Sequence, residues 1–102
     1  MIRYYVIKDD YIKQIVIRGH SAQNKLGRDI VCASVSTLII SSINLIIRLR
    51  LDELIEYEQD NGYASVVVSN FNETLDTILI NLEASLDDLE NQYSAYIKKE
   101  KK

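Results

Sequence analysis

The sequence contains few of the residues that cross-link a small protein. It has one cysteine, so no disulfide can form within the chain. With a single histidine beside that cysteine, it also lacks the four Cys or His ligands that a structural zinc site typically needs, and no cofactor is expected. Its 102 residues, 47% of them hydrophobic, are enough for one domain with a hydrophobic core of its own.

An excess of positive charge is also absent. The net charge is −3, so direct nucleic-acid binding and attraction to an anionic membrane are not expected. Residues 1–10 carry charges inside their apolar run and no small-residue cleavage site, which argues against a secretory signal and favours a reducing, cytoplasmic setting. The uncharged stretch 30–47 contains six Ser, Thr or Asn residues, which predicts a helix buried in a globular protein rather than a membrane span.

Hydrophobic periodicity predicts the element order β-β-α-β-β-α. Two pairs of segments rich in β-branched and aromatic residues read as hairpins, 2–8 with 11–18 and 53–59 with 63–69. Asn61-Gly62 predicts a tight turn in which both residues have positive φ. Two helical patterns follow the hairpins, at 29–49 and, after Asn72 as N-cap, up to Tyr96.

This order predicts an α+β fold, an antiparallel sheet packed with two long helices. The domain is expected to cover residues 1–98, with 99–102 as a frayed, charged tail. The helix at 30–49 is apolar on more faces than one sheet can cover, so a homodimer is expected.

The one histidine and the one cysteine lie twelve residues apart. His20 follows a strand, and with Asp29 as N-cap, Cys32 would lie in the first turn of the first helix. Unpaired N–H groups and the helix dipole at that position would favour a thiolate, and an imidazole within reach could accept its proton. Composition alone favours a blander interpretation, in which Cys32 is a small buried hydrophobe and His20 a surface residue.

The string from Ile17 to Ser36, IRGHSAQNKLGRDIVCASVS, changes that balance. It resembles the ribosomal-processing cysteine protease (Prp) family, in which a Gly-His pair ends a strand and a loop with Gly-x-Asp precedes a Cys followed by small residues and a Ser one turn later. The matching residues here are Gly19, His20, Gly27, Asp29, Cys32, Ala33 and Ser36.

The resemblance implies a homodimeric cysteine endopeptidase that removes the N-terminal extension of large-subunit ribosomal protein twenty-seven during ribosome assembly. Its partner would be the extended precursor, with Cys32 as nucleophile and His20 as general base and then acid. Asp29 would cap the helix or orient the imidazole, and Ser36 would line the pocket floor, donate to a bound carbonyl or simply pack. Gly19 and Gly27 would serve the geometry of a loop, 21–28, that covers the bound peptide.

Two other classes of function stay open at this point. A non-enzymatic, dimeric ribosome-assembly adaptor would use Cys32 only for packing and would have an unreactive thiol. A small thiol-dependent ester or thioester hydrolase would have an apolar tunnel for an acyl chain. The sequence displays neither feature.

Overall fold

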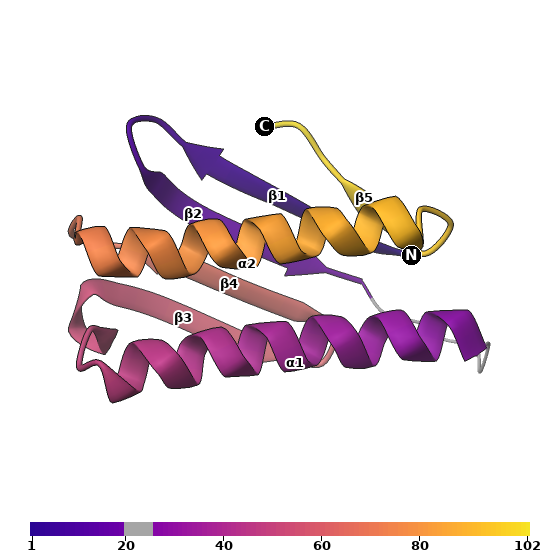
Figure 1. Ribbon diagram of the computed structural model, residues 1–102, viewed down its shortest axis with the longest axis horizontal. Helices are drawn as coiled ribbons and strands as arrows, with labels where there is room; N and C mark the ends of the chain where they lie inside the picture. Colours follow the sequence, from indigo (N-terminus) through magenta and orange to yellow (C-terminus); the bar gives the residue numbers. More distant parts are fainter. Residues whose placement is uncertain (20–25) are drawn as a thin grey trace.

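The computed structural model describes residues 1–19 and 26–102, and over residues 26–29 the backbone alone. Two antiparallel helices lie side by side over one face of a mixed five-stranded sheet (Figure 1). The elements follow one another as β1 (Ile2–Lys8), β2 (Ile12–Arg18), α1 (Leu26–Arg48), the 3₁₀ turn η1 (Asp52–Leu54), β3 (Ile55–Asp60), β4 (Tyr63–Val68), α2 (Glu73–Gln92) and β5 (Ile97–Lys99). The α+β class and the order of the first six predicted elements are confirmed.

The sheet has the strand order β3-β4-β2-β1-β5. Both predicted hairpins are antiparallel, and β2 joins them by pairing antiparallel with β4. Strand β5 pairs parallel with β1, which makes the sheet mixed. The sheet is therefore mostly, but not wholly, the antiparallel sheet that the sequence predicts.

Helix α1 buries one stripe and leaves the opposite side uncovered. Its core residues recur at spacings of three and four, as Val31, Val35, Ile39, Ile43 and Ile46. Ile40, Leu45 and Ile47 are each more than 40% exposed. Ile30–Arg48 is long and apolar enough to cross a membrane by length and composition alone, a test that core helices of soluble proteins also pass. In the single chain 28% of that segment is buried, so α1 is not the buried helix that the sequence predicts, and its uncovered side is the apolar surface for which a homodimer is expected.

Helix α1 also begins earlier than the sequence suggests. It starts at Leu26, so Gly27 lies inside its first turn and Asp29 is not the N-cap. A glycine in a helix costs only about 1 kcal/mol relative to alanine, which a 23-residue helix tolerates. Cys32 is therefore in the second turn, where its N–H has an intrahelical acceptor, and the predicted first-turn position is wrong.

The turn and helix ends in the second half of the chain are partly as predicted. In the β3–β4 turn only Gly62 has positive φ (77°), so the prediction that Asn61 shares that conformation is wrong. Asn72 caps α2, because its Oδ1 accepts a hydrogen bond of 2.9 Å from the Leu75 N–H. The helix ends at Gln92, so Tyr96 lies beyond it rather than in its last turn.

The C-terminal residues are more ordered than the expected frayed tail. Lys99 belongs to β5, and the Glu100 N–H donates a 2.7 Å bond to the Tyr4 carbonyl. The Glu100 carboxylate accepts two bonds, at 3.0 and 3.1 Å, from the Arg18 guanidinium. Backbone pairing with β1 and the Arg18–Glu100 ion pair therefore both hold this segment.

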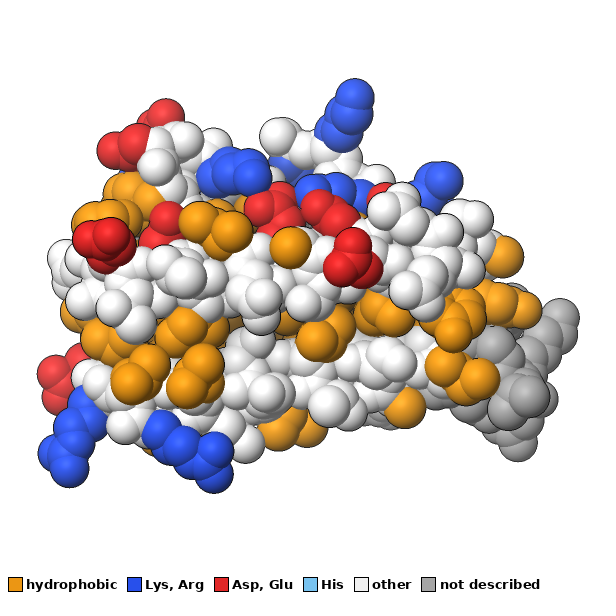
Figure 2. Space-filling view, in the orientation of Figure 1, with side chains coloured by type: hydrophobic (Ala, Val, Ile, Leu, Met, Phe, Trp, Pro, Cys, Tyr) orange, Lys and Arg blue, Asp and Glu red, His pale blue; other side chains and the backbone are white. Residues whose placement is uncertain are grey.

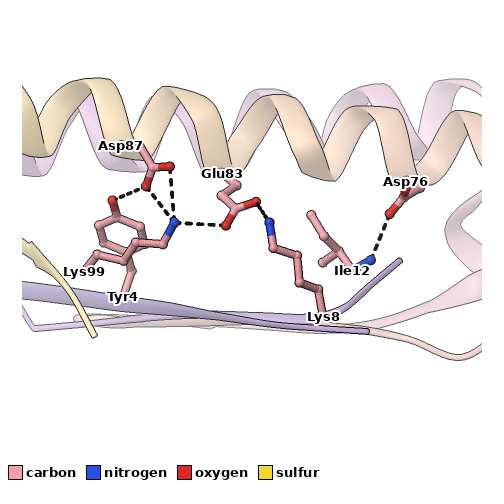
Figure 3. A network of polar contacts seen from close by, with 7 residues as sticks. All are labelled: Tyr4, Lys8, Ile12, Asp76, Glu83, Asp87 and Lys99. Carbon is pink, nitrogen blue, oxygen red and sulfur yellow. Dashed lines mark hydrogen bonds and ion pairs between the residues drawn. The ribbon is translucent and has the colours of Figure 1, made fainter. Parts of the chain in front are cut away.

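A network of charged groups fixes α2 over this edge of the sheet (Figure 3). Glu83, only 7% exposed, accepts bonds from Lys8 Nζ at 2.9 Å and Lys99 Nζ at 3.0 Å. Burial by itself would raise the pKa of the Glu83 carboxyl, but the hydrogen bonds from the two ammonium groups outweigh burial and lower it. Asp87 accepts from the buried Tyr4 hydroxyl and also pairs with Lys99. Among the described side chains, no buried polar atom lacks a partner.

Candidate active site

Four segments of the chain meet around a cavity of about 150 Å³ at one end of the sheet. Helix α1 supplies one wall, the ends of β1 and β2 supply another, and the β3–β4 hairpin closes the third side. The lining residues are Ile2, Ile17, Gly19, Cys32, Val35, Ser36, Ile39 and the run Gln59, Asp60, Asn61, Gly62, Tyr63 and Ala64.

Cys32 and Ser36 face this cavity from α1. They are four residues apart and therefore on one face of the helix, as predicted. Cys32 is a free thiol that is partly exposed and packs at the margin of the core. Cys32 therefore lines the cavity while it also packs against the core.

Gly19 is fixed by two requirements at the end of β2. Its φ is 99°, and a side chain there would collide with the Met1 carbonyl oxygen. Its N–H donates a 2.8 Å hydrogen bond to the Gly62 carbonyl. Only glycine satisfies both conditions, and the bond joins the chain just before His20 to the turn on the far side of the cavity.

The β3–β4 hairpin contributes polar groups that the sequence did not assign to a site. Gln59, Asp60 and Asn61 line the cavity, and Asp60 Oδ1 accepts a 2.7 Å bond from the Asn61 N–H. The sequence identified Asn61-Gly62 as a turn, but nothing in it links residue 60 to residue 32. That link depends on the sheet register, in which β4 pairs with β2 and so carries the turn to Gly19.

The predicted site residues fall into three groups. Gly19, Cys32 and Ser36 come together at the cavity. His20 and residues 21–25 lie outside the described residues, so the structure says nothing of the predicted His20–Cys32 pair or of that part of the covering loop. Gly27 and Asp29 lie in α1 rather than in a loop or at a cap, and the Asp29 side chain is also outside the described part.

A larger groove of about 490 Å³ runs along the other side of α1, where that helix meets α2. Figure 2 shows hydrophobic side chains gathered along this seam. It is lined by Ala33, Ser34, Thr37, Leu38, Ser85, Asp88, Leu89 and Gln92, and it contains neither Cys32 nor Ser36. This groove is larger than the cavity beside Cys32, but no cysteine lines it. Within the described residues, no three His, Cys, Asp or Glu side chains cluster as metal ligands would.

The smaller cavity has the parts for covalent chemistry by a thiol. A partly exposed cysteine lines a space that is also lined by Ser36, Gln59 and Asn61, whose side chains carry a hydroxyl and two amides. Such groups can donate hydrogen bonds to an oxygen that gains negative charge when a thiol attacks a carbonyl. The sequence predicts unpaired N–H groups at this position, but the Cys32 N–H is paired inside α1 and cannot donate to that oxygen.

Comparisons with known proteins point to the same chemistry. The model of the family described as cysteine protease Prp matches residues 1–98. Proteins named ribosomal processing cysteine protease Prp, from two strains of Staphylococcus aureus, are 29% identical to this chain over 89 residues. The match covers 85% of this chain and 84% of each relative.

Solved structures agree with these matches. The S. aureus protease Prp in complex with a substrate peptide superimposes with a TM-score of 0.87 at 27% identity, over the whole of both chains. The same protease with a covalently linked product peptide gives 0.85 at 28% identity, again over both whole chains. A protein from Streptococcus mutans, at 21% identity and a TM-score of 0.81, covers 99% of this chain and 93% of its own and shares the fold.

Proposed function

The chain belongs to the cysteine protease Prp family, and on that premise we propose that it removes the N-terminal extension of large-subunit ribosomal protein twenty-seven. The observation that carries the proposal is the position of Cys32, a partly exposed free cysteine that lines the cavity. The names of the relatives support a ribosomal protein as substrate, and a structural relative binds a substrate peptide.

The reaction is acyl transfer through the Cys32 thiol. His20 accepts the thiol proton, and Sγ then forms a bond to the scissile carbonyl carbon. The C–N bond of the peptide breaks as His20 returns the proton to the leaving amine. The shortened protein leaves as that amine, and water then hydrolyses the thioester, which releases the N-terminal extension as its carboxylic acid and restores the thiol.

Two features of the described residues support these roles. Gly19, which lines the cavity, directly precedes His20 in the sequence. Ser36, Gln59 and Asn61 are placed around the same space to donate to the oxyanion.

The proposal includes a homodimer in the cytoplasm. The outward side of α1 exposes Ile40, Leu45 and Ile47, and the apolar groove between the helices continues that surface. A second copy would bury side chains that the single chain leaves in water. Light scattering at micromolar concentration should give twice the mass of one chain, and the mass of a single chain would remove the dimer from the proposal.

The test of the function is cleavage of the full precursor protein, read by intact-mass spectrometry. Wild-type protein should release one N-terminal peptide, and Cys32→Ala should release none while keeping its thermal stability. A matched pair of serines controls for disturbance of α1, because Ser36 faces the cavity and Ser34 lines the other groove. Ser36→Ala should slow cleavage, whereas Ser34→Ala should not.

Cleavage by Cys32→Ala at the wild-type rate would refute the protease assignment. An uncleaved precursor that binds tightly to the wild-type protein would favour the adaptor. Hydrolysis of thioesters without cleavage of the precursor would favour the thiol esterase.

A further inference from the structure

Strand β3 ends the sheet on the side away from β5. Its only partner among the described residues is β4, and every β3 residue after Ile55 is exposed. The strand contains no proline and no register shift within its pairing to β4. An edge of this kind presents unpaired backbone groups to another chain.

The pairing register shows which groups these are. The Leu54 carbonyl accepts a 2.8 Å bond from the Ser69 N–H, and hydrogen-bonded pairs alternate along antiparallel strands. Glu56, Glu58 and Asp60 therefore bond to β4. The N–H and C=O groups of Tyr57 and Gln59 face the free edge, whereas the Ile55 N–H is already bonded to the Asp52 carbonyl.

Side chains alternate across the same strand. Ile55 is buried toward the helices, so Glu56, Glu58 and Asp60 all face the opposite side of the sheet. No Lys or Arg forms an ion pair with these three carboxylates within the described part of the chain. The edge thus combines free backbone groups with a row of negative charge on one face.

The edge leads directly into the cavity that contains Cys32. Gln59 and Asp60, at the end of β3, are edge residues and cavity-lining residues at once. A chain extended along β3 in the direction of Asp60 would reach the margin of that cavity.

We propose that the free edge of β3 binds the substrate as an added strand, and that it selects a peptide with Lys or Arg at alternate positions beside the scissile bond. Opposite charges that face each other across a strand pair stabilise it, and main-chain bonds supply the remaining affinity. A second copy of this chain fits the edge poorly, because two such acidic rows would oppose each other. The inference rests on the proposed function, since it names the class of peptide that the same site takes.

The test uses Cys32→Ala protein, so that binding is measured without cleavage. The probes are three fluorescent synthetic peptides that contain the same cleavage segment of the precursor. On both sides of that segment, Ser alternates with Lys in the first peptide, with Gln in the second and with Glu in the third. The double variant Glu56→Gln/Glu58→Gln removes two charges from the edge. Asp9→Asn/Asp10→Asn is the matched control, because it removes two exposed charges from the β1–β2 turn at a distance from the cavity.

The edge variant should bind the Lys peptide about 2- to 30-fold more weakly, the effect of losing two cross-strand charge pairs. It should leave the affinity for the Gln peptide unchanged, and the control variant should leave the affinities for both peptides unchanged. N-methylation along the Lys peptide should weaken binding at every second amide only, because alternate amides of an added strand point to β3.

Equal effects on the Lys and Gln peptides, or no periodicity in the N-methyl series, would overturn the inference. Dissociation of a wild-type oligomer in Glu56→Gln/Glu58→Gln would assign the edge to a second copy and overturn the inference as well. These outcomes are separate from those for the function. A wild-type protein that cleaves the precursor with no edge effect refutes only the edge, and edge binding without cleavage refutes only the protease proposal.

Discussion

The two edges of the sheet carry charged side chains in opposite arrangements. At the β5 edge, Glu83 and Asp87 of α2 are bonded to Lys8, Lys99 and Tyr4 (Figure 3). At the β3 edge, three carboxylates face outward, and no described Lys or Arg pairs with them. Asp and Glu side chains thus stabilise the fold at the β5 edge, where the chain supplies their partners. At the β3 edge, the corresponding carboxylates stay available to a bound peptide.

The comparison predicts a clean division between stability and activity. Changes near the β5 edge should lower the free energy of unfolding and spare the chemistry. Changes around the cavity and the β3 edge should lower activity and spare the fold.

The largest expected effect is on activity. His20→Ala should lower the turnover number for the precursor by about 10²–10⁴-fold, because it removes the general base. The temperature of unfolding should stay close to that of the wild type. Turnover assays and calorimetry on the same samples check this, and retained activity would mean that another group takes the thiol proton.

The next effect is on stability, at the β5 edge. Glu83→Ala should lower the free energy of unfolding by about 1–3 kcal/mol, since it removes a buried acceptor of two ammonium groups. Urea denaturation measures the loss. Glu56→Gln, at the opposite edge, should change stability by less than about 0.5 kcal/mol. Similar losses for the two variants would remove the contrast between the edges.

The contribution of Glu83 should also depend on pH. Its pKa is lowered in the folded state, because hydrogen bonds from Lys8 and Lys99 outweigh the opposing effect of burial. The stabilisation is therefore complete above the unfolded value of about 4.3 and is lost as the pH falls through the folded value. The stability difference between wild type and Glu83→Gln should shrink over that range, and a difference that grows on acidification would contradict the sign of the shift.

The smallest effect concerns the C-terminal segment. The ion pair between Arg18 and Glu100 joins side chains that are 50% and 21% exposed, so Glu100→Gln should cost at most about 1 kcal/mol. The cost should decline in high salt. A salt-independent loss would indicate that packing, rather than charge, holds this segment.

The elements of the fold were predictable where local chemistry decides them. Period-two segments identified four strands, and Asn72 marked the start of α2. The start of α1 was not predictable, because Gly27 is typical of a loop and Asp29 of a helix N-cap, whereas the helix includes both residues. Strand β5 was missed since its three residues, Ile97–Lys99, are held by distant partners on β1 and α2 rather than by their own pattern.

The site was predictable only in part for the same reason. The string around His20 and Cys32 identified the candidate pair, and Ser36 follows from helical spacing. Gln59, Asp60 and Asn61 reach the cavity through strand pairing, which no local pattern encodes.

Covalent trapping of the thiol tests the central claim most directly, that the cavity beside the β3–β4 turn is the active site. The chain has one cysteine, so every thiol adduct formed by a chloromethyl ketone of the precursor's cleavage peptide is on Cys32. We expect one adduct by mass spectrometry, formed much faster than on a free thiol, slowed by His20→Ala and blocked by excess precursor. Labelling no faster than that of a free thiol, and indifferent to His20 and to precursor, would contradict the account.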